Sequence, residues 1–494
     1  EEQPQVREIT VPFTYETQAG GINDTEVHNI VWYERTVELK SVDPDTNRVL
    51  LHFEGSDYRT GVWINGWYVG EHTGGYERFT FDITEHIKSG ENKIRVCVED
   101  SLSMTQPRGK QRWQTENFGC WYVQTTGIWK TVWLESVPRN YLKYVKMTPD
   151  VKNRSLHLEY EMELAGEQDC EDLAIETEIC MEDRVVSRSM TEVTEARTKM
   201  SLSLERQDGT EPWMIYLWRP EDPKLYDVTF RVWKNGQILD QVYSYFGMRE
   251  IEIRDGNILL NGIPLYQKLI LDQGYWEESH LTPPSEEALI EDIDKIHALG
   301  YNGLRKHEKV EDERFLYWCD VKGMLVWSEA PSTYRFNDDA METFSREWMS
   351  IVKQNYNHPC IIVWTPFNES WGIPQVRTDR RQQNFTEGIY HMTKAMDAMR
   401  PVICNDGWEH TVSDILTLHD YEADGSRLYR HYMDHREGIL NNQVPHSGER
   451  FAFAEGYHYR GQPVIISEFG GIAFTGDDDG WGYGDKVGSE EEFL

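Results

Sequence analysis

Two glutamates in similar surroundings are the clearest sign of chemistry in this sequence. In "CIIVWTPFNESWG", an apolar run from Ile361 to Trp364 is followed by Asn368 and Glu369. In "PVIISEFGG", a second apolar run ends in Glu468, followed by an aromatic residue and glycine. Two carboxylic acids that face one cavity are the minimum apparatus for breaking a glycosidic bond, because one attacks the anomeric carbon while the other protonates the departing oxygen.

Further polar residues stand at the ends of other apolar runs in the same half of the chain. A single residue of this kind is most often a solvated loop residue, so the prediction depends on their recurrence. Parallel barrels collect their chemistry at the carboxyl ends of the strands. The residues predicted to bind a substrate at these ends are Asp272, Arg305, His307, Asn368, Trp371, Asp406, Trp408, His419 and Tyr421.

The residue types indicate how such a site would work. Asn368 can hold a sugar hydroxyl, and Tyr421 can hydrogen-bond the nucleophilic glutamate and orient it. Trp371 or Trp408 can stack on the face of a sugar. When two carboxyl groups are crowded together, the ionised one raises the pKa of its neighbour, which then keeps its proton near neutral pH.

From about residue 249, short apolar runs alternate with helical patterns. The clearest helix is "TPPSEEALIEDIDKIHALG", in which Ser285 can cap the start and Gly300 can end the helix. The predicted strands are 265–271, 301–305, 324–328, 360–365, 401–404, 415–418 and 463–467. The pattern predicts a (β/α)8 barrel without its last unit. An eighth strand is absent from this chain, supplied by another segment, or not recognisable from its pattern.

Two all-β regions are predicted ahead of the barrel. In residues 1–136, "GVWINGWYVG" carries Asn65 and Gly66 between two β-prone runs, which is a strong hairpin signal. In residues 137–248, "FRVWKNGQILDQVYSYFG" contains a second Asn-Gly hairpin. The predicted domains are therefore a jelly-roll sandwich over 1–136, an immunoglobulin-like β-sandwich over 137–248 and a catalytic TIM barrel over 249–494.

Composition narrows the classes of partner. The net charge of −35 argues against nucleic acid or an anionic membrane surface, and no stretch has the apolar length of a membrane span. The 18 Trp and 26 Tyr suit β-rich domains and clefts that stack sugars. Seven cysteines without a CxxC pair are typical of a reducing compartment and predict a cytoplasmic location. Because the chain begins without Met, a removed export signal stays an open alternative.

Motifs of other enzyme classes are missing or incomplete. His431 and His435 in "HYMDH" have helical spacing but lack the glutamate of the metalloprotease motif. No GxSxG elbow, Walker loop or dinucleotide fingerprint is found. The acidic segment "TGDDDGWGYGD" has carboxylates suited to Ca²⁺ without the spacing of an EF-hand, and we interpret it as a loop near the active-site mouth. We expect no cofactor and no metal site.

With these motifs in place, the chain resembles glycoside hydrolase family 2, which contains β-galactosidases, β-glucuronidases and β-mannosidases. "GVWINGWYVGEHTGGYERFTFDIT" and "TTGIWKTVWLES" resemble its sugar-binding jelly roll, "YSYFGMREIEI" resembles the junction into its barrel, and "LLNGIPLYQK" resembles the first barrel strand. "FNES" matches the acid/base motif and "ISEFGG" matches the nucleophile motif. The resemblance implies that Glu369 is the acid/base, Glu468 the nucleophile and Asn368 the partner of a sugar hydroxyl.

The resemblance also implies the activity and the partner, which are a retaining exo-β-glycosidase and a terminal β-linked sugar. A β-galactoside is the first expectation for the substrate and a β-glucuronide is the alternative, because Arg305, Lys306 and His307 would attract an anionic sugar. "LILDQGYW", "RKHEKVED" and "NDGWEH" differ from the best-known versions of both enzymes. A second alternative is a non-catalytic carbohydrate-binding protein, which the two intact glutamates count against. A homo-oligomer whose jelly roll contributes a loop to a neighbouring subunit is a further expectation.

Overall fold

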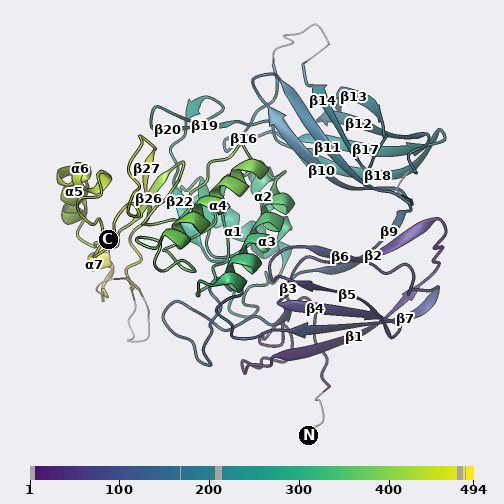
Figure 1. Cartoon of the computed structure of the whole chain (residues 1–494), viewed down its shortest axis with the longest axis horizontal. Coiled ribbons are helices and arrows are strands. Elements are labelled where there is room, and N and C mark those ends of the chain that lie inside the picture. The colour runs from purple at the N-terminus through teal and green to yellow at the C-terminus, as the bar shows by residue number, and fades with distance from the viewer. Residues whose placement is uncertain (1–5, 167–168, 206–213, 475–481, 484–485, 494) are drawn as a thin grey trace.

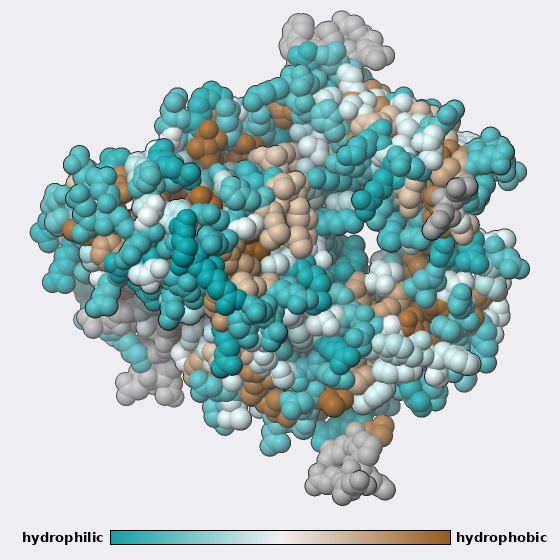
Figure 2. Space-filling model, viewed as in Figure 1, coloured by the Kyte–Doolittle hydropathy of each residue, from teal (hydrophilic) through white to brown (hydrophobic). Residues whose placement is uncertain are grey.

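The computed structural model of the chain describes residues 6–166, 169–205, 214–474, 482–483 and 486–493. Two antiparallel β-sandwiches precede a parallel barrel, and both sandwiches pack on the same side of the barrel (Figure 1). Figure 2 shows a largely hydrophilic surface on this face, with hydrophobic residues in small separate groups. Among the described helices, none has the length and apolar character needed to cross a bilayer.

The N-terminal sandwich forms because apolar residues alternate along its strands and meet between two sheets. The sheets have the orders β1-β7-β4-β5 and β6-β2-β9, and Leu51, Val62 and Val96 are buried between them. Asn65 and Gly66 have φ of 51° and 90°, as a type I′ hairpin turn requires. The strands are β1 Ile30–Leu39, β2 Asn47–Phe53, β3 Ser56–Asp57, β4 Arg59–Ile64, β5 Trp67–Thr73, β6 Phe79–Asp82, β7 Gly90–Glu99, β8 Gly127–Ile128 and β9 Val132–Pro138.

The second sandwich has its own core between the sheets β10-β11-β14 and β13-β12-β17-β18. Leu158, Tyr160 and Phe230 are buried in this core. The predicted turn at Asn235 and Gly236 joins β17 to β18, again with both φ values positive. The strands are β10 Tyr141–Asp150, β11 Ser155–Glu163, β12 Leu173–Met181, β13 Arg184–Glu192, β14 Arg197–Ser203, β15 Trp218–Arg219, β16 Asp222–Pro223, β17 Tyr226–Lys234 and β18 Gln237–Phe246.

A short antiparallel sheet leads into the barrel, and the barrel strands then pair in parallel. The barrel sheets have the orders β22-β23-β24-β25 and β26-β27. No eighth parallel strand occurs among the residues that the structure describes. The strands are β19 Ile251–Arg254, β20 Asn257–Leu260, β21 Ile263–Pro264, β22 Leu269–Asp272, β23 Gly303–Lys306, β24 Leu325–Glu329, β25 Ile361–Thr365, β26 Leu416–His419 and β27 Val464–Glu468.

The predicted strand at 401–404 is wrong as a regular strand, although the segment occupies the fifth barrel position. Parallel bridges join Trp364 to Val402 and Asn368 to Asp406, which links it to β25. On its other side, Val402 N donates to the side chain of Asp414 at 2.9 Å instead of to a strand backbone. Cys404 N likewise donates to Ser413 Oγ at 2.9 Å, so side chains accept the backbone N–H groups on this side.

The barrel helices begin and end at the residue types that cap helices. Ser285 Oγ accepts from Ala288 N at 3.2 Å at the start of α1, as predicted, and Leu289, Ile293 and Ile296 are its buried face. The helices are α1 Glu286–Ala298, α2 Glu313–Lys322, α3 Asp338–Asn355, α4 Arg380–Met396, α5 Gly425–Asp434, α6 Arg436–Leu440 and α7 Glu490–Phe493.

The jelly roll is anchored to the barrel by buried polar contacts. Glu347 of α3 accepts hydrogen bonds from the backbone N–H groups of Gly75 and Tyr76 at 2.9 and 2.8 Å. The loop 100–126, between β7 and β8, extends to the barrel, where Arg108 N donates to Ser332 O at 2.9 Å. These contacts hold the loop against the carboxyl ends of the barrel strands.

Candidate active site

Glu369 and Glu468 meet at the carboxyl ends of β25 and β27. One carboxylate oxygen of each and one ring nitrogen of His419 all lie within 4.8 Å of one another. The Glu369 side chain is 12% exposed and that of Glu468 is 6% exposed, so both still reach solvent. Retaining glycosidases hold their carboxyl groups about 5–5.5 Å apart and inverting ones about 6.5–9.5 Å apart. The close approach fits the retaining arrangement.

A strained turn after β25 aims Glu369 at this position. Glu369 and Ser370 have φ of 50° and 60°, a conformation that costs roughly 1–2 kcal/mol for each L-residue. Glu369 N donates to Asp406 O at 2.9 Å, and Ser370 N donates to Asn405 Oδ1 at 3.0 Å, which holds the turn. Backbone strain of this kind clusters where a side chain must be placed for function.

A buried arginine organises the carboxylates beneath the pair. Arg305, on β23, pairs with Glu329, with Asp406 at 3.0 Å and with Glu468. Although burial acts in the opposite direction, this guanidinium keeps the pKa values of Glu329 and Asp406 below their ordinary range. Tyr421 donates its hydroxyl to the second oxygen of Glu468, as predicted from its residue type. Because one cation serves three carboxylates, Glu468 is not held in a one-to-one ion pair.

His419 joins the acid/base candidate to this network. Its Nδ1 lies 2.8 Å from Glu369 Oε1 and its Nε2 lies 3.2 Å from Asp406 Oδ2. Burial lowers the pKa of His419, but the hydrogen bonds and charges of Asp406 and Glu369 have the larger effect and raise it. Burial alone would raise the pKa of Glu369, yet the hydrogen bond and charge of His419 lower it. The crowding of the two carboxyl groups predicts a raised pKa for one of them, whereas the contact with His419 lowers the pKa of Glu369.

Three of the residues predicted to touch the substrate lie beneath the site. The side chains of Asp406 and His419 are fully buried and that of Arg305 is 2% exposed. The polar contacts of their side chains are with one another and with other residues of the chain. Arg305, Asp406 and His419 therefore support the two glutamates through their own contacts, and their contact with a substrate stays a prediction.

Two other predicted residues carry buried donors without a hydrogen-bond partner among the described residues. Asn368 Oδ1 accepts from Arg305 Nη1 at 3.3 Å, while its Nδ2 has no hydrogen-bond partner among the described residues. The indole Nε1 of Trp408 is likewise buried without a partner in that part of the chain. Since nearly all buried donors in proteins find an acceptor, these two fit a hydroxyl-rich ligand.

The remaining predicted residues border the same region. The rings of His307 and Trp371 have centroids 6.0 Å apart, and His307 Nδ1 lies 2.7 Å from Glu329. Burial lowers the pKa of His307 to about 4, so it is neutral near pH 7. Asp272 pairs with Lys306 at 2.6 Å, so the positive charge expected from Lys306 is already neutralised.

Three family models match the chain in the order of its structural regions. Residues 2–138 match "Glycosyl hydrolases family 2, sugar binding domain", 140–249 match "Glycosyl hydrolases family 2", and 251–480 match "Glycosyl hydrolases family 2, TIM barrel domain". The chain belongs to glycoside hydrolase family 2. This confirms the resemblance drawn from the two glutamate motifs, and the family's fold of jelly roll, immunoglobulin-like sandwich and TIM barrel is the one observed.

Relatives of this family 2 chain are named for two different sugars. It is 28% identical over 397 residues to a putative β-glucuronidase of Formosa agariphila, covering 77% of this chain and 45% of that protein. It is 30% identical over 330 residues to a β-galactosidase of Thermoanaerobacter pseudethanolicus, covering 65% of this chain and 42% of that one. The chain thus spans less than half the length of both relatives. The structure of Bifidobacterium dentium β-glucuronidase complexed with coumarin-3-O-glucuronide has a TM-score of 0.77 at 19% identity, covering 100% of this chain and 82% of that chain.

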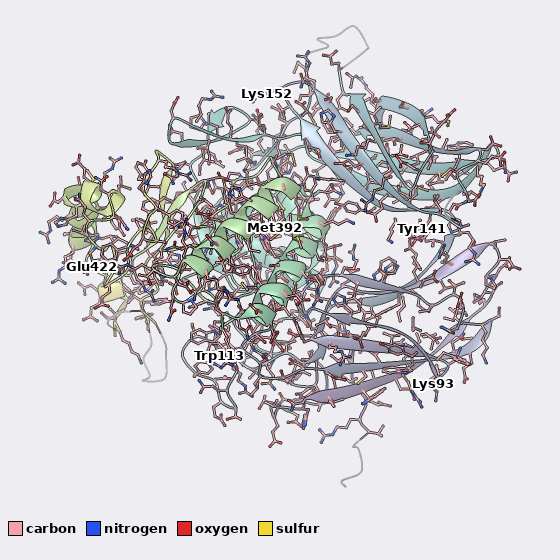
Figure 3. All side chains as sticks on the ribbon, viewed as in Figure 1. Lys93, Trp113, Tyr141, Lys152, Met392 and Glu422 are labelled. Carbon is pink, nitrogen blue, oxygen red and sulfur yellow. The ribbon has the colours of Figure 1, made fainter. Side chains whose placement is uncertain are left out.

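The jelly roll contributes an aromatic cluster to the family 2 site, and this cluster is not predicted from the sequence. Trp113 (Figure 3) and Trp121, from the loop 100–126, pack against Tyr334. Trp121 also contacts Trp371. On the opposite side, Tyr483 stacks on Tyr421 with ring centroids 3.6 Å apart. The aromatic residues of this loop are the only local feature of its sequence that suggests ligand binding. Nothing in its sequence indicates that it meets the barrel.

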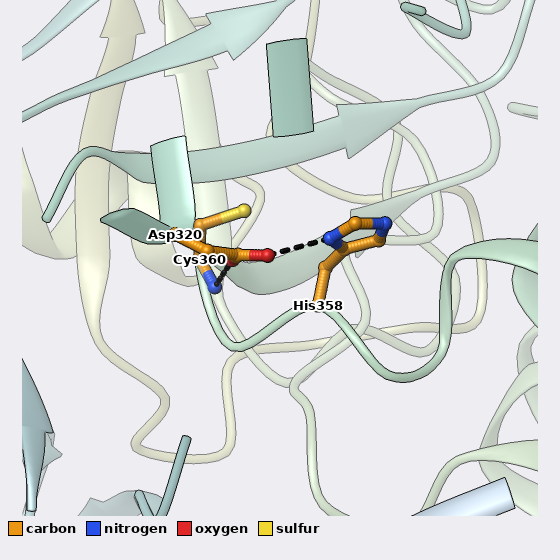
Figure 4. Close-up of side chains that lie close together, drawn as sticks. All are labelled: Asp320, His358 and Cys360. Carbon is orange, nitrogen blue, oxygen red and sulfur yellow. Dashed lines mark hydrogen bonds and ion pairs between the residues drawn. The ribbon is translucent and has the colours of Figure 1, made fainter. Parts of the chain in front are cut away.

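Two clusters have the residue types of metal ligands. Glu369, His419 and Glu468 form one, but both nitrogens of His419 are already bonded to carboxylates. Asp320, His358 and Cys360 form the other (Figure 4). Cys360 lies directly before β25, at the opposite end of that strand from Glu369. There Asp320 accepts from His358 at 2.6 Å and from Cys360 N at 2.8 Å, and burial raises the pKa of the Cys360 thiol. Both clusters are therefore explained by hydrogen bonding within the chain.

Two further segments contain residue types that can bind metal ions. The rings of His431 and His435 lie 5.9 Å apart on and after α5, and neither belongs to a ligand cluster in the described residues. The acidic segment "TGDDDGWGYGD" covers 475–485, most of which is outside the residues that the structure describes. All seven cysteines, each of them described, are free thiols.

Proposed function

We propose that this chain is a retaining exo-β-glycosidase that removes terminal β-linked uronic acids, as β-glucuronidases do. The observation that carries the proposal is the approach of the Glu369 and Glu468 carboxylates to within 4.8 Å at the ends of two barrel strands. Such a pair can supply a nucleophile and a proton donor to the two ends of one glycosidic bond.

In the first step, Glu468 attacks the anomeric carbon, and the bond from that carbon to the aglycone oxygen breaks. Glu369 transfers a proton to the departing oxygen, so the aglycone leaves as a neutral alcohol or phenol. In the second step, water attacks the anomeric carbon of the glycosyl-enzyme, Glu369 accepts the proton of the water, and Glu468 leaves as a carboxylate. The two displacements return the sugar with its original β-configuration.

The hydrogen bond between His419 and Glu369 holds the proton that the first step needs. His419 Nδ1 lies 2.8 Å from Glu369 Oε1, and Asp406 lies on the other side of the ring. The pair shares one proton, which passes to Glu369 as the leaving oxygen draws on it. His419 is thus a positioning residue, while Glu369 is the group that contacts the substrate.

The choice of sugar is supported by the names of the relatives. The sequence analysis placed galactoside first, but the Formosa agariphila relative, matched over 77% of the chain, is named a putative β-glucuronidase. A β-galactoside is the second candidate, since the relative from Thermoanaerobacter pseudethanolicus is 30% identical and named a β-galactosidase. Arg305 and Lys306 do not contribute to this choice, because both are paired with carboxylates of the chain.

The test is a panel of 4-nitrophenyl β-glycosides with a neutral and an anionic member for each sugar, namely glucoside, glucuronide, galactoside and galacturonide. We expect turnover of a uronide, a β-configured first product in NMR, and loss of turnover in Glu468→Gln. Glu91→Gln, at an exposed glutamate of β7, is the matched control and should keep the wild-type rate.

Turnover confined to the galactoside would replace the proposal with its second candidate. Sugar binding without hydrolysis of any member would favour the carbohydrate-binding alternative instead. An α-configured first product would exclude a covalent intermediate on Glu468.

A further inference from the structure

The jelly roll delivers a buried lysine to the mouth of the barrel. Gly109, in the loop 100–126, approaches the barrel so closely that a Cβ atom there would lie 2.1 Å from Glu308 O. Its φ of 59° is also one that glycine adopts readily. The next residue, Lys110, is only 3% exposed. The close contact therefore fixes a positive charge beside the end of β23.

Lys110 differs from the other buried lysines of the described residues in its partners. Its ammonium has one hydrogen-bond partner there, Cys120 Sγ at 3.2 Å, and forms no ion pair. A buried ammonium without an oxygen partner is costly and uncommon. The other three all bond to oxygen atoms, Lys306 to Asp272 and Glu311, Lys309 to Glu311, and Lys130 to the carbonyl of Val310.

Indole rings stabilise the charge of Lys110 and leave its N–H groups available. The Nζ atom lies 4.4 Å from the ring centroid of Trp371 and 5.6 Å from that of Trp121. Aromatic faces attract a cation but are weak hydrogen-bond acceptors. Since an ammonium has three donors and Cys120 takes one, two remain for a ligand.

The nearby carboxyl groups do not serve as counter-ions. Glu308 accepts from the Ser332 hydroxyl at 2.7 Å, and burial followed by the charge of Glu329 raises its pKa to about 8. Near neutral pH it is mostly uncharged. Glu369 is bonded to His419, although the field of Lys110 contributes to lowering its pKa. Lys110 is thus within electrostatic range of the reaction centre, and no carboxylate of the described residues forms an ion pair with it.

We infer that Lys110 binds the carboxylate of a uronic-acid glycone, so that the jelly roll supplies the charge that selects an anionic sugar. This inference rests on the proposed function and names a specificity residue for it. Trp371 follows Glu369 by two positions, which places the ammonium beside the sugar that the acid/base serves. A bound carboxylate would give Lys110 the ion pair that it lacks within the part of the chain that the structure describes.

The test compares Lys110→Met with the wild-type full chain on 4-nitrophenyl β-glucuronide and β-glucoside. These substrates share an aglycone and differ only in carrying a carboxylate or a hydroxymethyl group. We expect kcat/KM to fall about 10- to 100-fold for the glucuronide, mostly through KM, because a charge-assisted bond is lost. For the glucoside, kcat/KM should fall less than about 3-fold. The variant Lys110→Arg should retain part of the wild-type kcat/KM for the glucuronide.

Lys93→Met is the matched control. Lys93 lies on the outer edge of the jelly roll (Figure 3), where it pairs with Glu34 at 2.9 Å, and its loss should change neither rate. Lys110→Gln keeps a donor for Cys120 without the charge, and it provides the same comparison if the methionine variant does not fold. Calorimetric titration with D-glucuronate and D-glucose measures binding separately from turnover.

Equal losses on both substrates, or undiminished glucuronate affinity in a folded Lys110→Met, would overturn the inference. If the wild type hydrolyses no glycoside, the proposed function fails. The inference about Lys110 is then tested by calorimetric titration alone. Glucuronate binding that depends on Lys110 would then support it, and absence of glucuronate binding by the wild type would overturn it.

Discussion

The contact between Glu347 and the jelly roll makes the stability of the molecule depend on pH. Glu347 is 1% exposed, and its Oε1 accepts the backbone hydrogens of Gly75 and Tyr76 while Oε2 has no partner among the described residues. Burial, followed by the nearby charge of Glu77, raises the pKa of Glu347 from 4.5 to about 8. Tyr76 in turn donates its hydroxyl to Arg108 O, so this contact helps to hold the loop that carries Lys110.

The sign and size of the effect follow from linkage. Because the folded-state pKa lies above the unfolded-state value, the folded chain binds this proton more tightly. The resulting stabilisation is complete below the unfolded pKa of 4.5 and is lost as pH rises through about 8. At about 1.4 kcal/mol for each pH unit between these values, the loss from about pH 5 to about pH 9 is about 4 kcal/mol.

Glu347→Gln removes this dependence, because the amide keeps the oxygen that accepts both backbone hydrogens and carries no ionisable proton. We expect urea denaturation to show the wild type losing about 4 kcal/mol more stability than the variant between about pH 5 and about pH 9. Glu342→Gln, at an exposed position of the same helix α3, is the control and should follow the wild type. Parallel pH profiles for wild type and Glu347→Gln would refute the assignment of a protonated Glu347 to this interface.

Three further predictions concern the site and the fold. In Glu369→Gln, kcat should fall about 10²- to 10⁴-fold for glycosides of poorly acidic phenols and much less for 4-nitrophenol, and a rate loss independent of leaving group would contradict the acid role. Arg305→Gln should lower the free energy of unfolding by about 3–5 kcal/mol, because Glu329 and Asp406 lose their cation; unchanged urea denaturation would contradict the network. Asn65→Ala, at φ of 51°, should cost about 1 kcal/mol in the same assay, and a gain in stability would show that the turn is not strained.

The barrel positions of the two glutamates could be predicted from local sequence. The runs before Glu369 and Glu468 are short, apolar and rich in β-branched residues, as buried parallel strands are, and a glutamate follows each within a few positions. A parallel barrel brings such strand ends to one face, so distance along the chain did not prevent the prediction. Asn65 and Asn235 specified their hairpins for an equally local reason, since few residues tolerate a positive φ.

The parts that could not be predicted depend on contacts between distant segments. The contact between His419 and Glu369 is an example, because burial opposes the raised pKa of His419 and the distant residue Asp406 supports it. Lys110 lies about 260 positions before its neighbour Trp371, and only the docking of the jelly roll brings them together. The segment 401–404 has β composition, but its backbone bonds to side chains such as Asp414, which no periodicity reveals.

The covalent step on Glu468 is tested most directly by trapping it. A 2-deoxy-2-fluoro β-glucuronosyl fluoride slows both displacements but carries a good leaving group, so a glycosyl-enzyme should accumulate. We expect intact-mass spectrometry to show one added sugar, peptide mapping to place it on Glu468, and Glu468→Gln to acquire none. A sugar attached to another residue, or product formation with no adduct on the wild type, would contradict the assignment of Glu468 as the nucleophile.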